Sequence, residues 1–236
     1  MKTLVLGGTT EARLLAEALG SEAVLSLAGV TAKPLPVRHR TGGFGGVEGL
    51  EAYLRAEKFQ NVIDATHPFA AHISHNAFEA AKQIGLPLLR LERPAWPREP
   101  EWQVVDNLME AAKAIPTGTR VFLSVGRQSL GAFLQRDDMW CLTRSIAPPN
   151  QAPFGEVILQ RPPFLLQDEL GLMVAHNITH LVSKNAGGEA TRAKLEAAKQ
   201  LGVKVIMVKR PRLPAVLTVE TVAEAVKWVK KPRGMI

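Results

Sequence analysis

Three of the chain's six histidines, His67, His72 and His75, lie close together in the stretch DATHPFAAHISHNA. Imidazole rings ligate metals and transfer protons near neutral pH, so a histidine cluster can mark a metal site or a catalytic site. On a helix, His72 and His75 would share one face, because they are three residues apart. Their spacing matches no established zinc pattern, HExxH included, and we therefore expect no metal site.

His67 differs from the other two histidines. It follows the apolar run VIDAT and precedes Pro68, which predicts the end of a strand and a helix whose first turn begins at the proline. Residues at strand ends in α/β sheets face the edge where ligands bind. His67 is therefore the candidate hydrogen-bonding residue and the candidate proton donor, whereas His72 and His75 are expected to be solvated or to cap a helix.

The opening stretch TLVLGGTTEARLLAEAL predicts a strand, a glycine-rich turn and a helix. Gly7 and Gly8 would let the backbone approach a ligand closely, and Thr9 or Thr10 can cap the helix and donate a hydroxyl. The unpaired N–H groups at the helix N-terminus suit a phosphate. The motif is neither GxGxxG nor a P-loop, so a plain tight turn remains the alternative. A second glycine-rich stretch, HRTGGFGGVEGL, is either a loop that approaches a ligand or a loop that binds nothing.

Two further polar stretches, SVGRQSL and SKNAGGEATRAKL, each follow a predicted strand and precede a helix. Both would lie at the carboxyl ends of strands, where open α/β sheets bind ligands. Arg127 offers a fork of donors for carboxylate or phosphate, and the segment from Lys184 and Asn185 to Gly187 and Gly188 would form a polar cradle.

Short apolar runs alternate with amphipathic helical stretches along the whole sequence, which predicts the α/β class with parallel sheets flanked by helices. The Pro-rich stretch RPAWPREPEW is typical of a linker. We therefore expect two Rossmann-like domains, residues 1–95 and 96–236, with a ligand cleft between them. Strands are expected at 3–6, 23–27, 61–65, 88–91, near 104, and at 120–124, 139–143, 180–183 and 203–208. Helices are expected at 11–19, 50–58, 70–84, 108–114, 167–175, 190–201 and 219–230.

Composition narrows the class of protein. The 236 residues are 46% hydrophobic and 22% charged, with no apolar run long enough for a membrane span and no recognisable export signal, so we expect a cytoplasmic protein without membrane contacts. The single cysteine, Cys141, excludes an intramolecular disulfide. The net charge of +7, with most of the excess in residues 94–236, favours anionic ligands. Dispersed arginines and an aromatic content of 6% argue against nucleic acid as the partner.

Several segments together resemble the precorrin-6A reductase family of corrin-ring (vitamin B12) biosynthesis. They are LGGTTEARLLA, GGFGG, VIDATHPFAAHISHNAFEAAKQIGLPLLRLERPAW, VFLSVGRQSL and LVSKNAGGEATRAKLEAAKQLGVKVIMVKRP, and they span nearly the whole chain in order. DATHPFA and KNxGG are the specific motifs, because the GGT turn occurs in many nucleotide-binding folds.

The resemblance implies NADPH-dependent reduction of one double bond of precorrin-6A, or of its cobalt-containing counterpart, to the 6B form. Both ligands are polyanions, in keeping with the basic charge balance. It implies a tetrapyrrole substrate and transient contacts with neighbouring enzymes of the pathway. By resemblance, the cofactor would contact Gly7, Gly8, Thr9, Thr10, Thr66, His67, Pro68, Lys184, Asn185, Gly187 and Gly188. The candidate contacts to substrate carboxylates or phosphate are Arg127, Arg144 and Arg13, with solvated surface arginines as the alternative.

One position departs from the family. After the second strand the family usually reads SLAGRT, whereas this chain reads SLAGVT, so Val30 replaces an arginine suited to the 2′-phosphate of NADPH. We expect Lys33 or an arginine from the other domain to substitute for it, so that NADPH is still preferred. Two other classes of function stay open at this stage: a nucleotide-dependent α/β enzyme without redox chemistry, and a basic nucleic-acid-binding protein.

Overall fold

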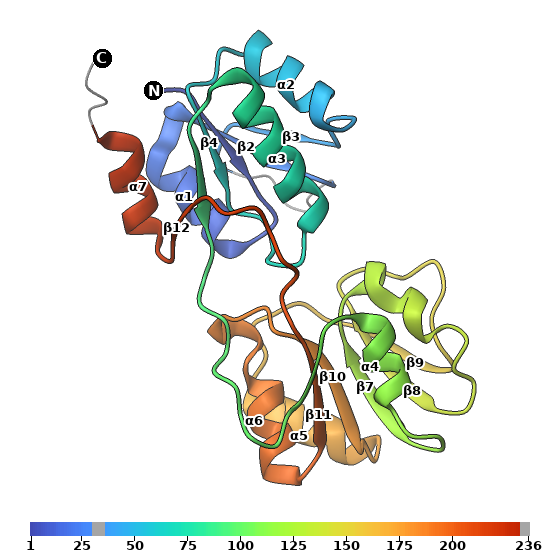
Figure 1. The fold of residues 1–236 in the computed structure, drawn as a ribbon. Coiled ribbons are helices and arrows are strands. Elements are labelled where there is room, and N and C mark those ends of the chain that lie inside the picture. The colour runs from blue at the N-terminus through green and yellow to red at the C-terminus, as the bar shows by residue number, and fades with distance from the viewer. Residues whose placement is uncertain (30–35, 232–236) are drawn as a thin grey trace. The chain divides into compact units, whose positions relative to one another are not determined.

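The computed structural model describes residues 1–29 and 36–231, which form two compact α/β units. The first unit contains residues 1–94 together with the chain from Arg212 onward, and the second contains Ala95–Pro211. In each unit, strands and helices alternate around one sheet (Figure 1). Val30 and Lys33, which bear on the expected 2′-phosphate contact, lie outside the described residues.

The sheet of the first unit is six-stranded and parallel throughout. Its strand order is β12-β5-β4-β1-β2-β3. The strands are β1 (Thr3–Leu6), β2 (Ala23–Leu27), β3 (His39–Thr41), β4 (Asn61–Asp64), β5 (Leu88–Leu91) and β12 (Leu217–Val219).

Helices cover both faces of this sheet, which is why all four residues of β1 are buried. Val5 packs in the core that includes α1 (Thr10–Leu19) and α7 (Val222–Lys230), whereas Leu4 and Leu6 pack in the core that includes α2 (Val47–Ala56) and α3 (Ala71–Ile84). Because successive side chains of a strand point to opposite faces of the sheet, β1 contributes to the core on each side. In Figure 1 the red α7 lies beside the blue α1.

The second unit repeats this arrangement with the parallel strand order β6-β11-β10-β7-β8-β9. Helices α5 and α6 pack together, and α4 contacts the 3₁₀ segment η2. The strands are β6 (Gln103–Val105), β7 (Arg120–Ser124), β8 (Trp140–Ser145), β9 (Gly155–Leu159), β10 (His180–Lys184) and β11 (Lys204–Val208). The helical segments are α4 (Leu108–Ala114), η2 (Arg127–Phe133), α5 (Leu166–Ala175), η3 (Glu189–Thr191) and α6 (Ala193–Leu201).

Each sheet contains one point where the direction of the winding reverses. In the first unit β1 lies between β2 and β4, and in the second β7 lies between β8 and β10. The loops after the two strands that flank such a switch point run in opposite directions and leave a crevice at the carboxyl edge of the sheet, where open α/β sheets bind ligands. Two switch points thus exist, one in each unit.

The edge strands show how the chain crosses between units. β6 follows β5 in sequence but pairs with β11 of the second unit, and β12 follows β11 but pairs with β5 of the first. β6 is thus the edge strand beside β11 in the second sheet, and β12 is the edge strand beside β5 in the first. The chain therefore makes two crossings, near Pro94 and near Pro211.

The predicted α/β class with two parallel sheets is confirmed. The expected second domain, 96–236, requires correction: the segment from Arg212 onward joins the first unit, because β12 extends its sheet and α7 packs against α1. The short strands β3, β9 and β12 were not expected from the sequence. Among the described residues, no helix combines the length and the apolar character needed to cross a bilayer.

Candidate active site

The turn after β1 requires glycine at two positions. The backbone N–H of Gly7 donates to the carbonyl of Ser26 on β2 at 2.8 Å, and a Cβ on Gly7 would lie 2.6 Å from Cδ1 of Leu25. Gly8 has a φ of +121°, a conformation that side chains rarely adopt. The predicted turn therefore forms at the switch point of the first unit, with its backbone free of side chains.

Thr9 joins the two strands that flank this switch point. Its hydroxyl donates to the carbonyl of Ala65, just after β4, at 2.8 Å and accepts the N–H of Ala12 at 3.1 Å as the N-cap of α1. The expected cap is thus Thr9, and its single hydroxyl proton is used within the protein. Thr10 is the exposed first residue of α1.

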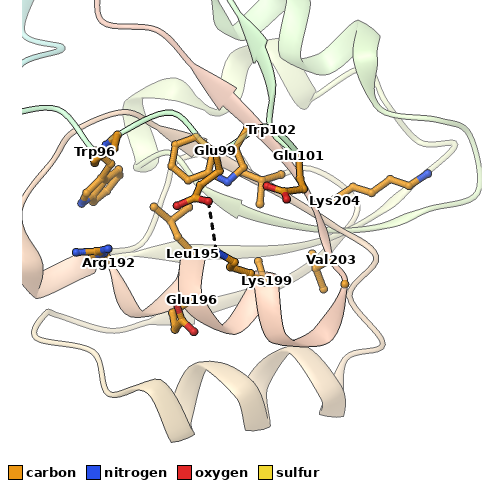
Figure 2. A pocket seen from close by; sticks show the side chains of 14 residues that line it. Trp96, Glu99, Glu101, Trp102, Arg192, Leu195, Glu196, Lys199, Val203 and Lys204 are labelled. Atoms are coloured by element: carbon orange, nitrogen blue, oxygen red, sulfur yellow. Dashed lines mark hydrogen bonds and ion pairs between the residues drawn. The ribbon is translucent and has the colours of Figure 1, made fainter.

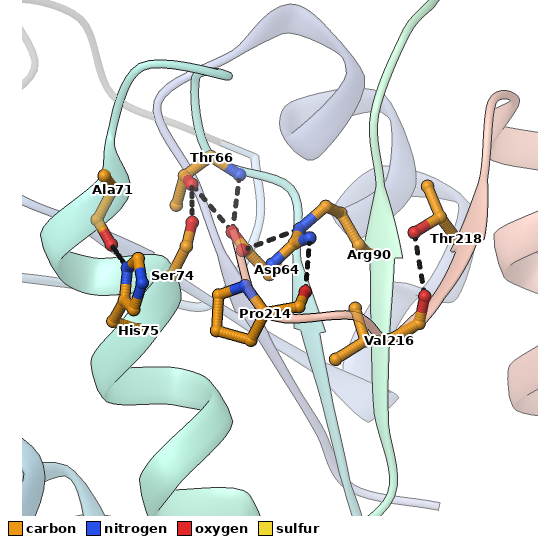
Figure 3. Close-up of polar contacts among 9 residues, drawn as sticks. All are labelled: Asp64, Thr66, Ala71, Ser74, His75, Arg90, Pro214, Val216 and Thr218. Atoms are coloured by element: carbon orange, nitrogen blue, oxygen red, sulfur yellow. Dashed lines mark hydrogen bonds and ion pairs between the residues drawn. The ribbon is translucent and has the colours of Figure 1, made fainter. Parts of the chain in front are cut away.

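The end of β4 carries a buried polar network (Figure 3). Asp64, which is 2% exposed, accepts the hydroxyl of Thr66 at 2.7 Å and the backbone N–H of the same residue at 3.2 Å. Its other oxygen pairs with Nε of the buried Arg90 at 3.4 Å, and Arg90 also donates to the carbonyl of Pro214 at 3.1 Å. The network therefore ties the loop containing Thr66 to the returning C-terminal segment. Sequence reasoning did not assign a role to Arg90.

His67 is half-buried, and Nδ1 of its ring accepts the backbone N–H of Phe69 at 3.2 Å. The helix does not begin at Pro68 as expected: a turn closed by the Ala70 N–H and the His67 carbonyl intervenes, and α3 begins at Ala71. A small hollow brings together three of the predicted residues, Thr9, Thr66 and Pro68, with Glu11, Leu91, Glu92 and Arg93.

His72 and His75 are exposed on α3, and Nδ1 of His75 lies 2.8 Å from the carbonyl oxygen of Ala71. Among the described residues, no group of three or more His, Cys, Asp or Glu side chains is placed to hold a metal ion. The two rings lie on the solvated surface of the helix.

At the switch point of the second unit, Lys184 at the end of β10 meets the segment that follows β7. Its Nζ donates to Oγ of Ser129 in η2 at 2.5 Å. Burial lowers the pKa of Lys184 to about 8, because desolvation penalises the charged amine. Gly126, with a φ of +81°, turns the chain between β7 and η2. The predicted SVGRQSL and KNAGG segments therefore meet.

The KNAGG loop, residues 184–188, is held by hydrogen bonds to residues near both chain crossings. The side-chain amide of Asn185 accepts the N–H of Trp96 at 2.9 Å and donates to its carbonyl at 3.2 Å. The indole N–H of Trp96 donates to the carbonyl of Gly188 at 3.1 Å, and Arg210 donates to the carbonyls of Asn185 at 2.9 Å and Ala186 at 3.2 Å. The Asn185 side chain thus shapes the loop, whereas Gly187 and Gly188 adopt positive φ.

The three candidate arginines lie in different settings. Arg127 is exposed at the start of η2, next to the switch point. Arg13 is exposed on α1 and pairs with Glu17 at 2.7 Å. Arg144 is only 6% exposed, and its guanidinium pairs with Glu169 at 2.6 Å and lies over the ring of Phe164 at 4.1 Å.

The expected contact of Arg144 with substrate stays a prediction, and the buried setting of the residue argues against it. Its partner Glu169 is fully buried, so the pair is an internal one. Releasing the arginine to a ligand would leave an unpaired buried carboxylate, which is strongly unfavourable.

A larger cavity, of about 280 Å³, lies elsewhere in the second unit. Figure 2 shows Trp96 and Trp102 on one side of it and α6 on the other, with the ion pair between Lys199 and Glu99 across it. Its walls include the beginning of β11 and so belong to the amino edge of the sheet rather than to the carboxyl edge. Trp96, which is bonded to the KNAGG loop, also lines the cavity, so this side chain adjoins both.

The family model described as precorrin-6x reductase CbiJ/CobK matches residues 2–230. A precorrin-6A reductase of Rhodococcus erythropolis is 48% identical, with 97% of each chain covered. A cobalt-precorrin-6A reductase of a Synechocystis strain is less similar, at 28% identity over 91% of this chain and 90% of that relative.

A solved structure described as CobK precorrin-6A reductase matches with a TM-score of 0.91 at 42% identity, covering 99% of this chain and all of that one. The sequence matches and the structural match each cover nearly the whole chain, including both sheets. The chain belongs to the precorrin-6A reductase family of cobalamin biosynthesis.

Proposed function

We propose that this protein reduces precorrin-6A to precorrin-6B with NADPH as the hydride donor. One observation carries the proposal. The chain belongs to this family, and in each unit the segments singled out in the sequence lie at the switch point of the sheet. Two bulky anionic ligands need two binding edges, and each unit supplies one. The ligand cleft expected between the units stays a prediction.

The turn after β1 fits a dinucleotide. Gly7 leaves no room for a Cβ and Gly8 adopts positive φ, so bare backbone lies at the N-terminus of α1, where N–H groups attract phosphate. Thr10 would add a hydroxyl, Thr9 would fix the turn, and the Thr66–Pro68 loop would border the site. The bound cofactor supplies a hydride, and the protein orients the reactants.

The charge after β2 favours NADPH over NADH. Enzymes that prefer NADH place an acidic residue on the ribose 2′-hydroxyl about 20 residues after the glycine turn. Here the sequence has no Asp or Glu between Glu22 and Glu48, whereas Lys33, Arg38 and Arg40 fall in that interval. A 2′-phosphate would meet cations rather than a carboxylate.

The second switch point suits the macrocycle. Arg127 is an exposed cation there. Lys184 and the KNAGG backbone, which the resemblance assigns to the cofactor, lie at this same switch point, and we propose that their donors serve the macrocycle instead. We further propose that the substrate is cobalt-free, because identity to the relative named precorrin-6A reductase, at 48%, exceeds identity to the one named cobalt-precorrin-6A reductase, at 28%. The reaction would take place in the cytoplasm, with transient contacts to neighbouring enzymes of the pathway.

The direct test follows the absorbance of NADPH with purified protein. We expect oxidation only when precorrin-6A is added, and a product heavier than the substrate by the mass of two hydrogen atoms. Adding cobalt-precorrin-6A in a parallel reaction tests the metal preference, and we expect slower turnover. Oxidation at the same rate without any macrocycle would contradict the proposed reaction.

Cofactor preference gives a second prediction. We expect kcat/KM for NADPH to exceed that for NADH at least about tenfold, since one well-placed cation on a phosphate contributes roughly 1.5–3 kcal/mol. Lys33→Ala should raise KM for NADPH and leave KM for NADH unchanged. Lys113→Ala, which removes an exposed lysine of α4 in the second unit, is the control. A wild-type enzyme that favours NADH would refute the assignment.

The hydrogen bonds around Asn185 predict a positioning role for Trp96. Trp96→Phe removes the indole bond to Gly188 and trims a ring that packs in the core and lies 4.8 Å from Nζ of Lys194. The KNAGG loop should loosen and ligand KM should rise about fivefold, the equivalent of about 1 kcal/mol, with little change in kcat. Trp102→Phe is the matched control, because Trp102 lines the same cavity and its side chain has no hydrogen bond to that loop among the described residues. Equal KM values for the two variants would show that the indole bond does not position the loop.

A further inference from the structure

The amine of Lys184 occupies a defined place at the second switch point. The residue ends β10, and its neighbour Ser183 pairs with Ser124 at the end of β7, so the two strand ends are level. The bond from Nζ to Oγ of Ser129 then links the loops that leave these two strands. An ammonium group with three donors is thus held where a ligand of this sheet would bind.

Its surroundings make this amine an unusually good acid for a lysine. Burial lowers its pKa to about 8, and a general acid works best when its pKa lies near the working pH. The charged side chains on the neighbouring segments are Arg127 after β7, and Lys209 and Arg210 after β11. Lys209 pairs with Asp106 at 2.6 Å, and Arg210 donates to loop carbonyls.

His67, the donor expected from the sequence, is less suited to that role. Its Nδ1 already accepts the backbone N–H of Phe69 at 3.2 Å. The residue also belongs to the first unit, where the turn that suits the dinucleotide lies, whereas Lys184 lies at the switch point proposed for the macrocycle.

We propose that Lys184 is the general acid of the reduction, an inference that rests on the proposed function. When hydride is added to one carbon of a macrocycle double bond, the electron pair of that bond moves to the neighbouring atom. Nζ gives this atom a proton, so one N–H bond breaks and one bond to hydrogen forms. The macrocycle gains two electrons, the dinucleotide loses them, and the neutral amine then takes a proton from water.

The main experiment compares single-turnover reduction by wild type and Lys184→Arg across pH. Arginine keeps the positive charge but holds its proton too tightly to donate it. We expect wild-type rates to be constant at low pH and to fall as pH rises through the pKa of Lys184, since only the protonated form donates. Lys184→Arg should reduce about 100-fold more slowly, with NADPH affinity within about threefold of wild type. Lys204→Arg, at the exposed start of β11, is the control.

A second measurement needs no turnover. Trace acetylation of the free enzyme, read by mass spectrometry as a function of pH, reports the pKa of each amine. Lys184 should react with a midpoint near pH 8, below the value of about 10.4 that a lysine has in a model peptide. A midpoint for Lys184 at the model-peptide value would overturn the proposal.

The outcomes separate the two proposals. If wild type reduces the macrocycle and Lys184→Arg is equally fast, the general-acid role is wrong and the proposed function stands. The same holds if His67→Gln, rather than Lys184→Arg, abolishes the fall of rate with pH. If wild type consumes no NADPH with either macrocycle, the proposed function fails and the role of Lys184 fails with it.

Discussion

A parallel sheet brings the carboxyl ends of all its strands to one edge, and every candidate residue of this protein depends on that constraint. The Gly7–Gly8 turn follows β1 and the Thr66–Pro68 loop follows β4, while Ser129 and Lys184 follow β7 and β10. These are the strand pairs at which the winding of each sheet reverses. Residues far apart in sequence therefore meet in pairs, as the bonds from Thr9 to Ala65 and from Lys184 to Ser129 show.

The two segments in which the chain passes from one unit to the other also bond to loops at these sheet edges. Trp96 follows the first crossing and Arg210 precedes the second, and both are hydrogen-bonded to the loop that begins at Asn185. Arg90 bonds the carbonyl of Pro214, just after the second crossing, and pairs with Asp64. The segments that exchange strands between the units are thus the same segments that fix the loops of the candidate site. A buried polar network fixes a loop only when its donors and acceptors are paired, and most polar atoms of Asp64, Arg90 and Asn185 are paired.

Much of this arrangement was predictable from local sequence patterns. Apolar runs such as TLVL and VIMV indicate buried strands, and Gly-rich or polar stretches that follow strands indicate loops at the ligand edge. What the sequence could not give is contact over long separations: β12 pairing with β5, or Arg144 buried against Glu169, leaves no local periodicity. The short strand β9 was missed for a different reason: four of its five residues are exposed, so it leaves no apolar run, and the sequence around it is rich in proline. The sequence pattern assigned Asn185 to a ligand, and in the structure its side chain holds Trp96, so that assignment stays a prediction.

The central claim is that hydride passes directly from the nicotinamide to the macrocycle on this protein. The measurement that tests it most directly uses NADPH deuterated at the transferred position, with mass spectrometry of the tetrapyrrole product. The account predicts one deuterium in the product from labelled cofactor in ordinary water, and one solvent-derived deuterium when unlabelled cofactor reacts in heavy water. A product that contains no label from the cofactor would contradict it.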